Sequence, residues 1–300
     1  METDNKPGCD ERVNRHMHAF ARVIVCISLL VHPNLPSSAQ AMFGSVVAVT
    51  ASDEEINIAA DSRAIAPNGD QRDTACKIGA FGNEMVYGNT GMTSYVNGKL
   101  SWDAIDIARE AYTRLKRVHS AKPVQIRIAE AWARTLQEKL QANLLRDKNE
   151  TLWDTKPDEP IIAAVFAGFD GQVPLIVVAS VRYSESRSGI PRAKGQIEHV
   201  YKDAHRVVGI GRAELVNEFN RQESMRAVEW WDRAIAGATS STDQLGLYTA
   251  EAVRFSIQYS PTKFVAGRTV EVLGGPVDAI RLGRIGGAGW IQRKPNCPVH

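Results

Sequence analysis

The 300-residue sequence lacks the features that are typical of nucleic-acid-binding and membrane-spanning proteins. Its formal net charge is only +2, and no basic stripe with interleaved aromatic residues occurs, so nucleic-acid binding is not predicted. The one long apolar run, Val23–Val31, is too short to span a bilayer as a helix. No repeat of solenoid period and no linker that would demand a domain split is present. With 44% hydrophobic residues, the chain can still bury a sizeable core.

Cysteine and cofactor motifs are also scarce. The four cysteines form no CxxC pair and no metal-ligand spacing, so no metal site is predicted. Gly209-Ile210-Gly211 lacks the third glycine of a dinucleotide-binding motif, and no cofactor is predicted. Cys9 and Cys26 lie near the N-terminus. Cys76 and Cys297 are compatible with a disulfide in an oxidising compartment, and equally with two separate thiols.

The N-terminal segment has the layout of a secretory signal peptide. Three arginines precede the apolar run 23–31, and the small-x-small sequence Ala39-Gln40-Ala41 follows it. We therefore predict a signal peptide over 1–41, export to the periplasm or out of the cell, and no stable membrane span after its removal. A buried strand or an anchor helix is the alternative interpretation. Because the positive flank is long, translation could start at Met17 rather than Met1.

Hydrophobic periodicity predicts blocks of strands, helices, strands, helices and strands, in that order. The predicted strands are 45–50, 56–60, 75–81, 84–88, 161–169, 174–182, 197–201, 207–210, 268–273 and 277–283. The predicted helices are 102–118, with Ser101 as N-cap, then 123–146, 212–221, 224–236 and 242–258. Segments 147–159 and 184–195 are predicted to be loops, and the tail after Gly289 has no clear pattern. Segregated blocks of this kind indicate an α+β fold with two stacked sheets and helices on their outer faces.

Three chemically reactive side chains occur at the edges of three successive predicted strands. Ser45 opens the first strand, Asp61 ends the second, and Lys77 lies in the third. A hydroxyl beside an amine that a carboxylate holds in place is a known form of activated nucleophile. We therefore expect the three side chains to converge at one end of a sheet. The alternatives are an ordinary strand serine and a structural Asp61–Lys77 ion pair.

The same stretch resembles the proteasome β-subunit branch of the N-terminal nucleophile (Ntn) hydrolases. The family pattern is matched by Gly44-Ser45, Ala59-Ala60-Asp61-Ser62-Arg63, Lys77-Ile78 and Thr90-Gly91. Counted from Ser45, the residues Asp61, Lys77 and Gly91 follow at 16, 32 and 46 positions, as in the family. The motif covers residues 44–91, and beyond it the likeness is one of element order. The resemblance implies a four-layer αββα sandwich.

The resemblance also implies a mechanism. Autocleavage between Gly44 and Ser45 would expose the α-amine of Ser45, which titrates at about 7.7–8.0 in small peptides and can serve as general base. The Ser45 hydroxyl would attack a carbonyl and form an ester. Lys77, held by Asp61, would lower the cost of deprotonating that hydroxyl, and the Gly91 N–H would stabilise the oxyanion.

Three further residues are expected to support this site. Arg63 is expected to support the loop of Asp61, and Thr90 is either a turn residue or a substrate contact. The family often has an Asp and two Ser around the amine of the nucleophile. Here Ile210 stands where one Ser is common, and Glu271 is the only nearby carboxylate that could replace the Asp.

The function implied by the resemblance is an exported, proteasome-like peptidase of the threonine/serine type, acting on a peptide or amide substrate. Its hydrolase domain would cover 45–290, between a short propeptide, 42–44, and a C-terminal tail, 291–300. A small-molecule acylase or amidase of the same fold is one alternative, and a catalytically silent assembly or binding protein is another. A homo-oligomer or ring is common in the family.

Overall fold

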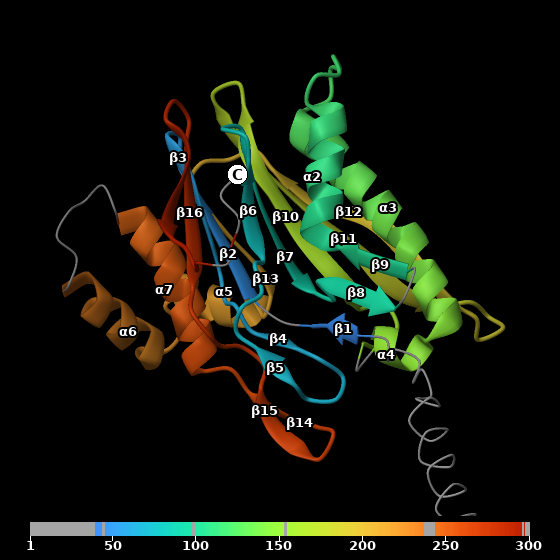
Figure 1. The fold of residues 1–300 in the computed structure, drawn as a ribbon. Helices are drawn as coiled ribbons and strands as arrows, with labels where there is room; N and C mark the ends of the chain where they lie inside the picture. The colour runs from blue at the N-terminus through green and yellow to red at the C-terminus, as the bar shows by residue number, and fades with distance from the viewer. Residues whose placement is uncertain are drawn as a thin grey trace, which may run out of the picture. The chain divides into compact units, whose positions relative to one another are not determined.

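The computed structural model describes residues 40–43, 46–97, 100–152, 155–236, 244–295 and 297. All of them belong to one compact unit, Ala39–His300 (Figure 1). The unit contains both helices and sheets, which confirms the predicted α+β class. Within the described ranges, no helix combines the length and apolarity needed to cross a membrane. Gly44, Ser45 and residues 1–39 lie outside the described residues.

The first large sheet packs against two helices. Its strands, in spatial order, are β12 (Pro191–Tyr201), β11 (Val173–Glu185), β10 (Pro160–Asp170), β7 (Met85–Gly91) and β6 (Ile78–Phe81), with antiparallel neighbours. Helices α2 (Ala104–Leu115) and α3 (Val124–Arg146) share a buried cluster with one face of this sheet. The predicted helical stripe is confirmed as core, since all its members are buried: Ile128, Trp132, Leu136, Leu140 and Leu144.

The second large sheet packs against the other helices. Its strands, in spatial order, are β13 (Arg206–Gly211), β2 (Val46–Ala51), β3 (Glu55–Ala60), β16 (Asp278–Gly283) and β17 (Gly287–Gln292). The helices are α5 (Ala213–Arg221), α6 (Met225–Ala236) and α7 (Gln244–Gln258). Phe219 and Phe255 of these helices share a buried cluster with Val46 and Ala48 of β2.

Strand β2 is buried on both faces. Val46 and Ala48 contribute to the cluster with the helices, whereas Val47 and Val49 contribute to a second cluster with Val165 of the first sheet. Successive side chains of a strand point to opposite faces, so a strand with apolar residues at every position suits the space between two layers. The apolar run 46–49 therefore explains why β2 occupies the interior.

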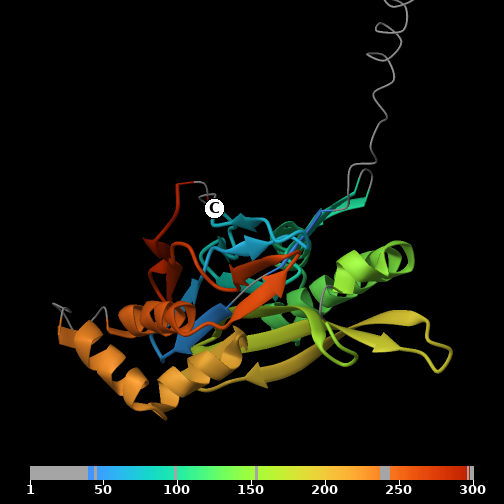
Figure 2. The same ribbon diagram turned by 90° about the horizontal axis from the view of Figure 1, so that it is seen from below.

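Smaller elements complete the unit (Figure 2). One small sheet contains β1 (Gln40–Met42), β8 (Ser94–Asn97) and β9 (Leu100–Asp103). Two others pair β4 (Ala64–Ile65) with β5 (Gln71–Arg72), and β14 (Thr262–Val265) with β15 (Arg268–Glu271). Helix α4 (Lys148–Leu152) lies within the segment predicted as a loop. Strand β1 covers the last two residues of the predicted signal peptide and the first residue of the predicted propeptide.

The structure corrects three local predictions. The expected loop 184–195 is mostly strand, because β11 and β12 continue as a hairpin in which buried Tyr183 pairs with Ala193. The tail after Gly289 contains the second half of β17, whose half-buried and exposed side chains left no periodic signal. The N-cap of α2 is Asp103 instead of Ser101, since its Oδ1 accepts the Ile105 N–H at 2.9 Å.

Helix α3 gives a matched test of the core. Leu136 is fully buried, and Leu145 on the same helix is 66% exposed. We expect Leu136→Ala to lower the free energy of unfolding by about 2–5 kcal/mol through lost burial and a residual cavity. Leu145→Ala should change it by less than about 0.5 kcal/mol. Urea unfolding followed by circular dichroism measures both, and equal losses would contradict the packing described here.

Candidate active site

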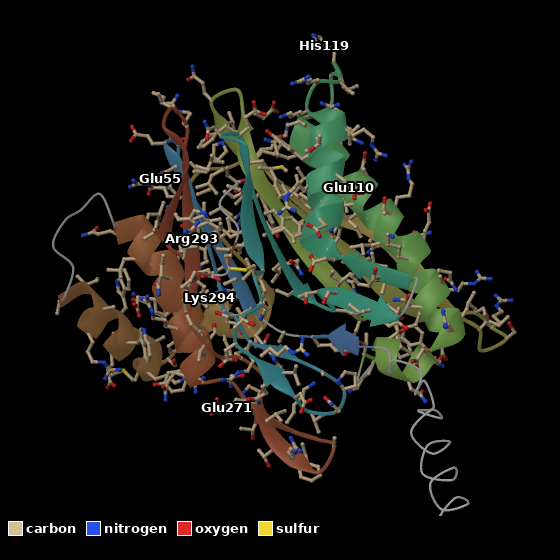
Figure 3. All side chains as sticks on the ribbon, viewed as in Figure 1. Glu55, Glu110, His119, Glu271, Arg293 and Lys294 are labelled. Carbon is tan, nitrogen blue, oxygen red and sulfur yellow. A yellow bond between two sulfur atoms is a disulfide. The ribbon has the colours of Figure 1, made fainter. Side chains whose placement is uncertain are left out.

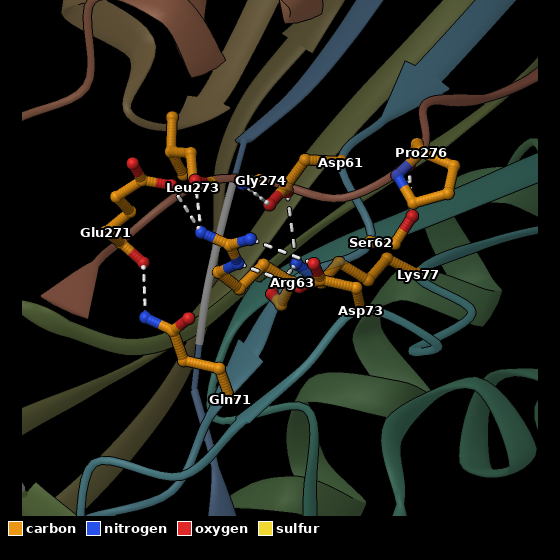
Figure 4. Close-up of polar contacts among 10 residues, drawn as sticks. All are labelled: Asp61, Ser62, Arg63, Gln71, Asp73, Lys77, Glu271, Leu273, Gly274 and Pro276. Carbon is orange, nitrogen blue, oxygen red and sulfur yellow. Dashed lines mark hydrogen bonds and ion pairs between the residues drawn. The ribbon is translucent and has the colours of Figure 1, made fainter.

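Asp61 and Lys77 form an ion pair that is completely buried. Lys77 Nζ lies 3.0 Å from Asp61 Oδ1, and both side chains have 0% exposure (Figure 4). The predicted contact between them is therefore present. Asp61 directly follows β3, whereas Lys77 directly precedes β6, so the pair joins two different sheets. The expectation of one end of a single sheet was wrong in this respect.

The Asp61 carboxylate also holds two backbone segments. Its Oδ1 accepts the Val46 N–H at 3.1 Å, and its Oδ2 accepts the Gly274 N–H at 3.2 Å. The Asp61 N–H donates back to the Val46 carbonyl at 3.4 Å. A buried carboxylate needs such donors, because an unpaired charge is costly to remove from water. Asp61 thus fixes the start of β2 relative to Lys77.

Burial changes the protonation of Lys77. Removal from water lowers the pKa of its ammonium to about 8, although the neighbouring Asp61 opposes this shift. The ammonium also donates to the Arg63 carbonyl, and the Lys77 carbonyl accepts the Asn89 N–H at 3.0 Å. Lys77 is therefore mainly charged at neutral pH and is linked to strand β7, which ends at Thr90 and Gly91.

Arg63 supports the Asp61 loop, as the sequence indicates. Its guanidinium binds Asp73 in a bidentate manner, with both N–O distances 2.8 Å, and Nη1 lies 2.8 Å from Glu271 Oε2. The guanidinium holds the pKa of the Asp73 carboxyl below its usual range. A Cβ on Gly274 would collide with Arg63 Cζ, so this turn requires glycine.

Glu271 lies at the solvent side of this network. Its side chain is 68% exposed and contacts Arg63, whose own side chain is 12% exposed, and its backbone carbonyl accepts a hydrogen bond from Gln71 Nε2 at 3.4 Å (Figure 4). Glu271 therefore anchors Arg63, and its environment differs from that of the buried pair. The carboxylate that was expected to replace the Asp of the resembled family therefore forms a surface ion pair.

The predicted nucleophile, Ser45, lies outside the described residues, as does the predicted autocleavage residue Gly44. Their chain neighbours on either side, Phe43 and Val46, are both held by hydrogen bonds. Phe43 exchanges two backbone hydrogen bonds with Ile65, at 2.9 and 2.7 Å. Val46, whose nitrogen forms the peptide bond with Ser45, donates to Asp61 Oδ1 at 3.1 Å.

Thr90 and Gly91 line a cavity of about 550 Å³. The cavity is also bordered by Phe43, by Gly211, which pairs with Val46, and by Val272, which follows Glu271. Gly91 has a φ of +85°, and a Cβ at this position would collide with the Ile161 carbonyl, so glycine is required there. The residues predicted to stabilise an oxyanion and contact substrate therefore border a cavity beside the start of β2.

The C-terminal segment adds a second buried ion pair that the sequence did not reveal. Lys294 is 8% exposed, pairs with buried Asp278, and donates to the Ala75 carbonyl at 2.8 Å (Figure 3). Cys297 forms a disulfide with Cys76, the residue before Lys77. Two residues of the predicted tail 291–300 are therefore bonded to Ala75 and Cys76, which directly precede Lys77. Isolated residues of this kind carry no motif, so spacing alone could not find them.

Comparison with known proteins leaves the family open. No family model matches the chain, and no curated protein matches it. Among the residues that the structure describes, no group of His, Cys, Asp and Glu side chains could hold a metal ion.

The buried pair predicts a pH dependence of stability. Between about pH 8 and pH 10.5 the folded chain has released the Lys77 proton while the unfolded chain still binds it. The unfolded state then binds more protons, so the free energy of unfolding should rise with pH, by up to about 3 kcal/mol. Urea unfolding across this range should show the rise in the native chain. The double variant Asp61→Asn/Lys77→Met keeps the other titrating groups and serves as the control. If the free energy of unfolding depends on pH in the same way in both proteins, the lowered pKa of Lys77 is contradicted.

The disulfide predicts a dependence on reductant. Cys76 and Cys297 are 221 positions apart, and a cross-link that closes a long loop typically stabilises a fold by about 2–5 kcal/mol. Reduction with a phosphine should therefore lower the free energy of unfolding by that amount. The double variant Cys76→Ala/Cys297→Ala should be insensitive to the reductant. A free energy of unfolding that stays unchanged after complete reduction of the native protein would contradict this contribution.

Proposed function

We propose that the chain is an exported amide-bond hydrolase of the Ntn class, similar to proteasome β-subunits, with Ser45 as its N-terminal nucleophile. The observation that carries this proposal is the buried Asp61–Lys77 pair, whose carboxylate binds the N–H of Val46, the residue after Ser45. The four motif elements in register with the family support the same assignment.

The proposed reaction begins with self-cleavage. The Ser45 hydroxyl attacks the Gly44 carbonyl, the Gly44–Ser45 peptide bond gives way to an ester, and water hydrolyses that ester to free the Ser45 amine. In each later turnover the hydroxyl attacks the substrate carbonyl and gives its proton to this amine. The amine returns a proton to the leaving nitrogen, and water then hydrolyses the acyl ester.

Lys77 and Gly91 would serve this reaction without changing covalently. At neutral pH the Lys77 ammonium would favour the alkoxide character of Ser45, because opposite charges attract more strongly beside a buried group than in bulk water. The Gly91 N–H would stabilise the oxyanion, and loss of one such donor costs about 2.7–4 kcal/mol in other hydrolases. The cavity beside Thr90 and Gly91 would hold the substrate.

The packing supports the four-layer αββα arrangement that the resemblance implies. One buried cluster joins α2 and α3 to the first sheet, a second joins the two sheets, and a third joins the second sheet to α5, α6 and α7. A layer order of helices, sheet, sheet and helices accounts for all three clusters.

The proposed export rests on two observations. The N-terminal segment has the order of a signal peptide, and the Cys76–Cys297 disulfide is typical of proteins in oxidising compartments. Ring or homo-oligomer assembly rests on the resemblance alone. An acylase of the same chemistry would use the same site.

The mass of the mature chain tests the proposal. We expect protein recovered from the exported fraction to begin at Ser45, with a free amine. Ser45→Ala should retain the preceding residues up to the signal-peptide site and should lose at least about 1,000-fold in turnover of any peptide or amide substrate, since the nucleophile is absent.

Thr50→Ala provides a matched control, because Thr50 lies further along the same strand, opposite Asn57 of β3, and its hydroxyl bonds Thr249 on α7. It should keep the Ser45 terminus and most activity. A mature terminus at Met42 or earlier, or turnover retained by Ser45→Ala, would instead favour a silent binding protein or another nucleophile.

A further inference from the structure

The described residues that line the cavity beside Thr90 and Gly91 include more cationic than anionic side chains. Three cationic side chains border it: Lys156, Arg212 and Lys263. Among the described residues of the lining, Glu159 is the one carboxylate, and its Oε2 already accepts the Lys156 backbone N–H at 3.0 Å. Cations gathered in one concave site attract an anion, and the rest of the lining is largely apolar or backbone.

Of the three cationic residues, Arg212 is the one joined to the strand that pairs with Val46. It directly follows Gly211, which pairs with Val46 at the end of the strand pair β13–β2. Its side chain is 30% exposed, and one nitrogen, Nη1, lies 3.3 Å from Glu214 Oε1. A guanidinium has five N–H donors, so this contact leaves donors of the fork for a second carboxylate.

The size of the cavity limits the ligand. About 550 Å³ lies within the range of small-molecule sites and suits one side chain with its adjoining backbone. Ile161 and Val272 supply apolar walls, and Thr90 and Thr155 supply hydroxyls, whereas Phe43 would leave with the propeptide. A short side chain that ends in a carboxylate would place its methylenes on the walls and its charge on the cations.

We propose that the substrate carries a carboxylate next to the scissile amide and that Arg212, with Lys156 and Lys263, binds it. This inference rests on the proposed function for the position of the scissile bond. The carboxylate could belong to a Glu or Asp side chain within a peptide, or it could be the α-carboxylate of a small N-acyl amino acid. Both sources present the same chemistry to the cavity.

The test compares substrates that differ only in charge. Internally quenched peptides with Glu or Gln next to the scissile bond should differ at least tenfold in kcat/KM, in favour of Glu. Arg212→Glu should abolish this preference or reverse it, whereas Arg212→Lys should retain a preference of reduced size. Lys156→Glu, at an exposed position, repeats the charge reversal in case Arg212→Glu fails to fold.

Arg117→Glu makes the same charge change at an exposed residue outside the cavity lining, and it should leave the Glu-to-Gln ratio unchanged. A parallel pair of small substrates, N-acyl-Gln and N-acyl-Gln amide, differs only in the α-carboxylate and therefore identifies the source of the carboxylate. Equal kcat/KM for Glu and Gln substrates, or a preference that survives both charge reversals, would overturn the proposal.

Binding separates this inference from the proposed function. Calorimetric titration of Ser45→Ala, freed of residues 1–44 through a protease site placed before position 45, should give at least tenfold tighter binding of acetyl-Glu amide than of acetyl-Gln amide, and Arg212→Glu in that background should remove the difference. If no amide is cleaved but this difference persists, the hydrolase proposal fails and the anion site stands. If amides are cleaved but binding shows no difference, the anion site fails alone.

Discussion

The buried ion pair between Asp61 and Lys77 is the interaction on which the rest of the site depends. Both side chains are fully excluded from water, and removing one partner of such a pair typically costs about 3–5 kcal/mol. The fold compensates by directing backbone groups at the charges: the N–H groups of Val46 and Gly274 at the carboxylate, and the carbonyl of Arg63 at the ammonium. The polar partners therefore fix several chain segments at one point.

That constraint joins the two large sheets. Asp61 follows β3 in one sheet, Lys77 precedes β6 in the other, and Val46 begins β2. The Gly274 carbonyl binds the backbone that follows Asp61, and Lys294 and Cys297 are bonded to the two residues that precede Lys77. This arrangement is the reason why we propose position 45, bonded to Val46, as the nucleophile and the cavity beside Gly91 as the place of its substrate.

The sequence predicted the parts of this arrangement that have strong local signals. The apolar stripe of residues 128–144 predicted α3, and the apolar run 46–49 predicted β2. The motif spacing predicted the contact between Asp61 and Lys77. Exposed strands such as β17 have no periodic signal, so their prediction failed. Contacts across more than 200 positions, such as Lys294 with Ala75 or Gly274 with Asp61, depend on packing and cannot be found from spacing. Glu271 was expected near the nucleophile, but it anchors Arg63 at the surface.

The central claim is that the hydroxyl of Ser45 meets the ammonium that Asp61 holds in the interior. A crystal structure of the mature chain measures this directly, as the distance between Ser45 Oγ and Lys77 Nζ. Our account predicts a separation of about 2.6–3.2 Å, within hydrogen-bond reach of a nucleophile and its activating group. A hydroxyl turned away from Lys77, with a separation beyond about twice hydrogen-bond reach, would contradict it.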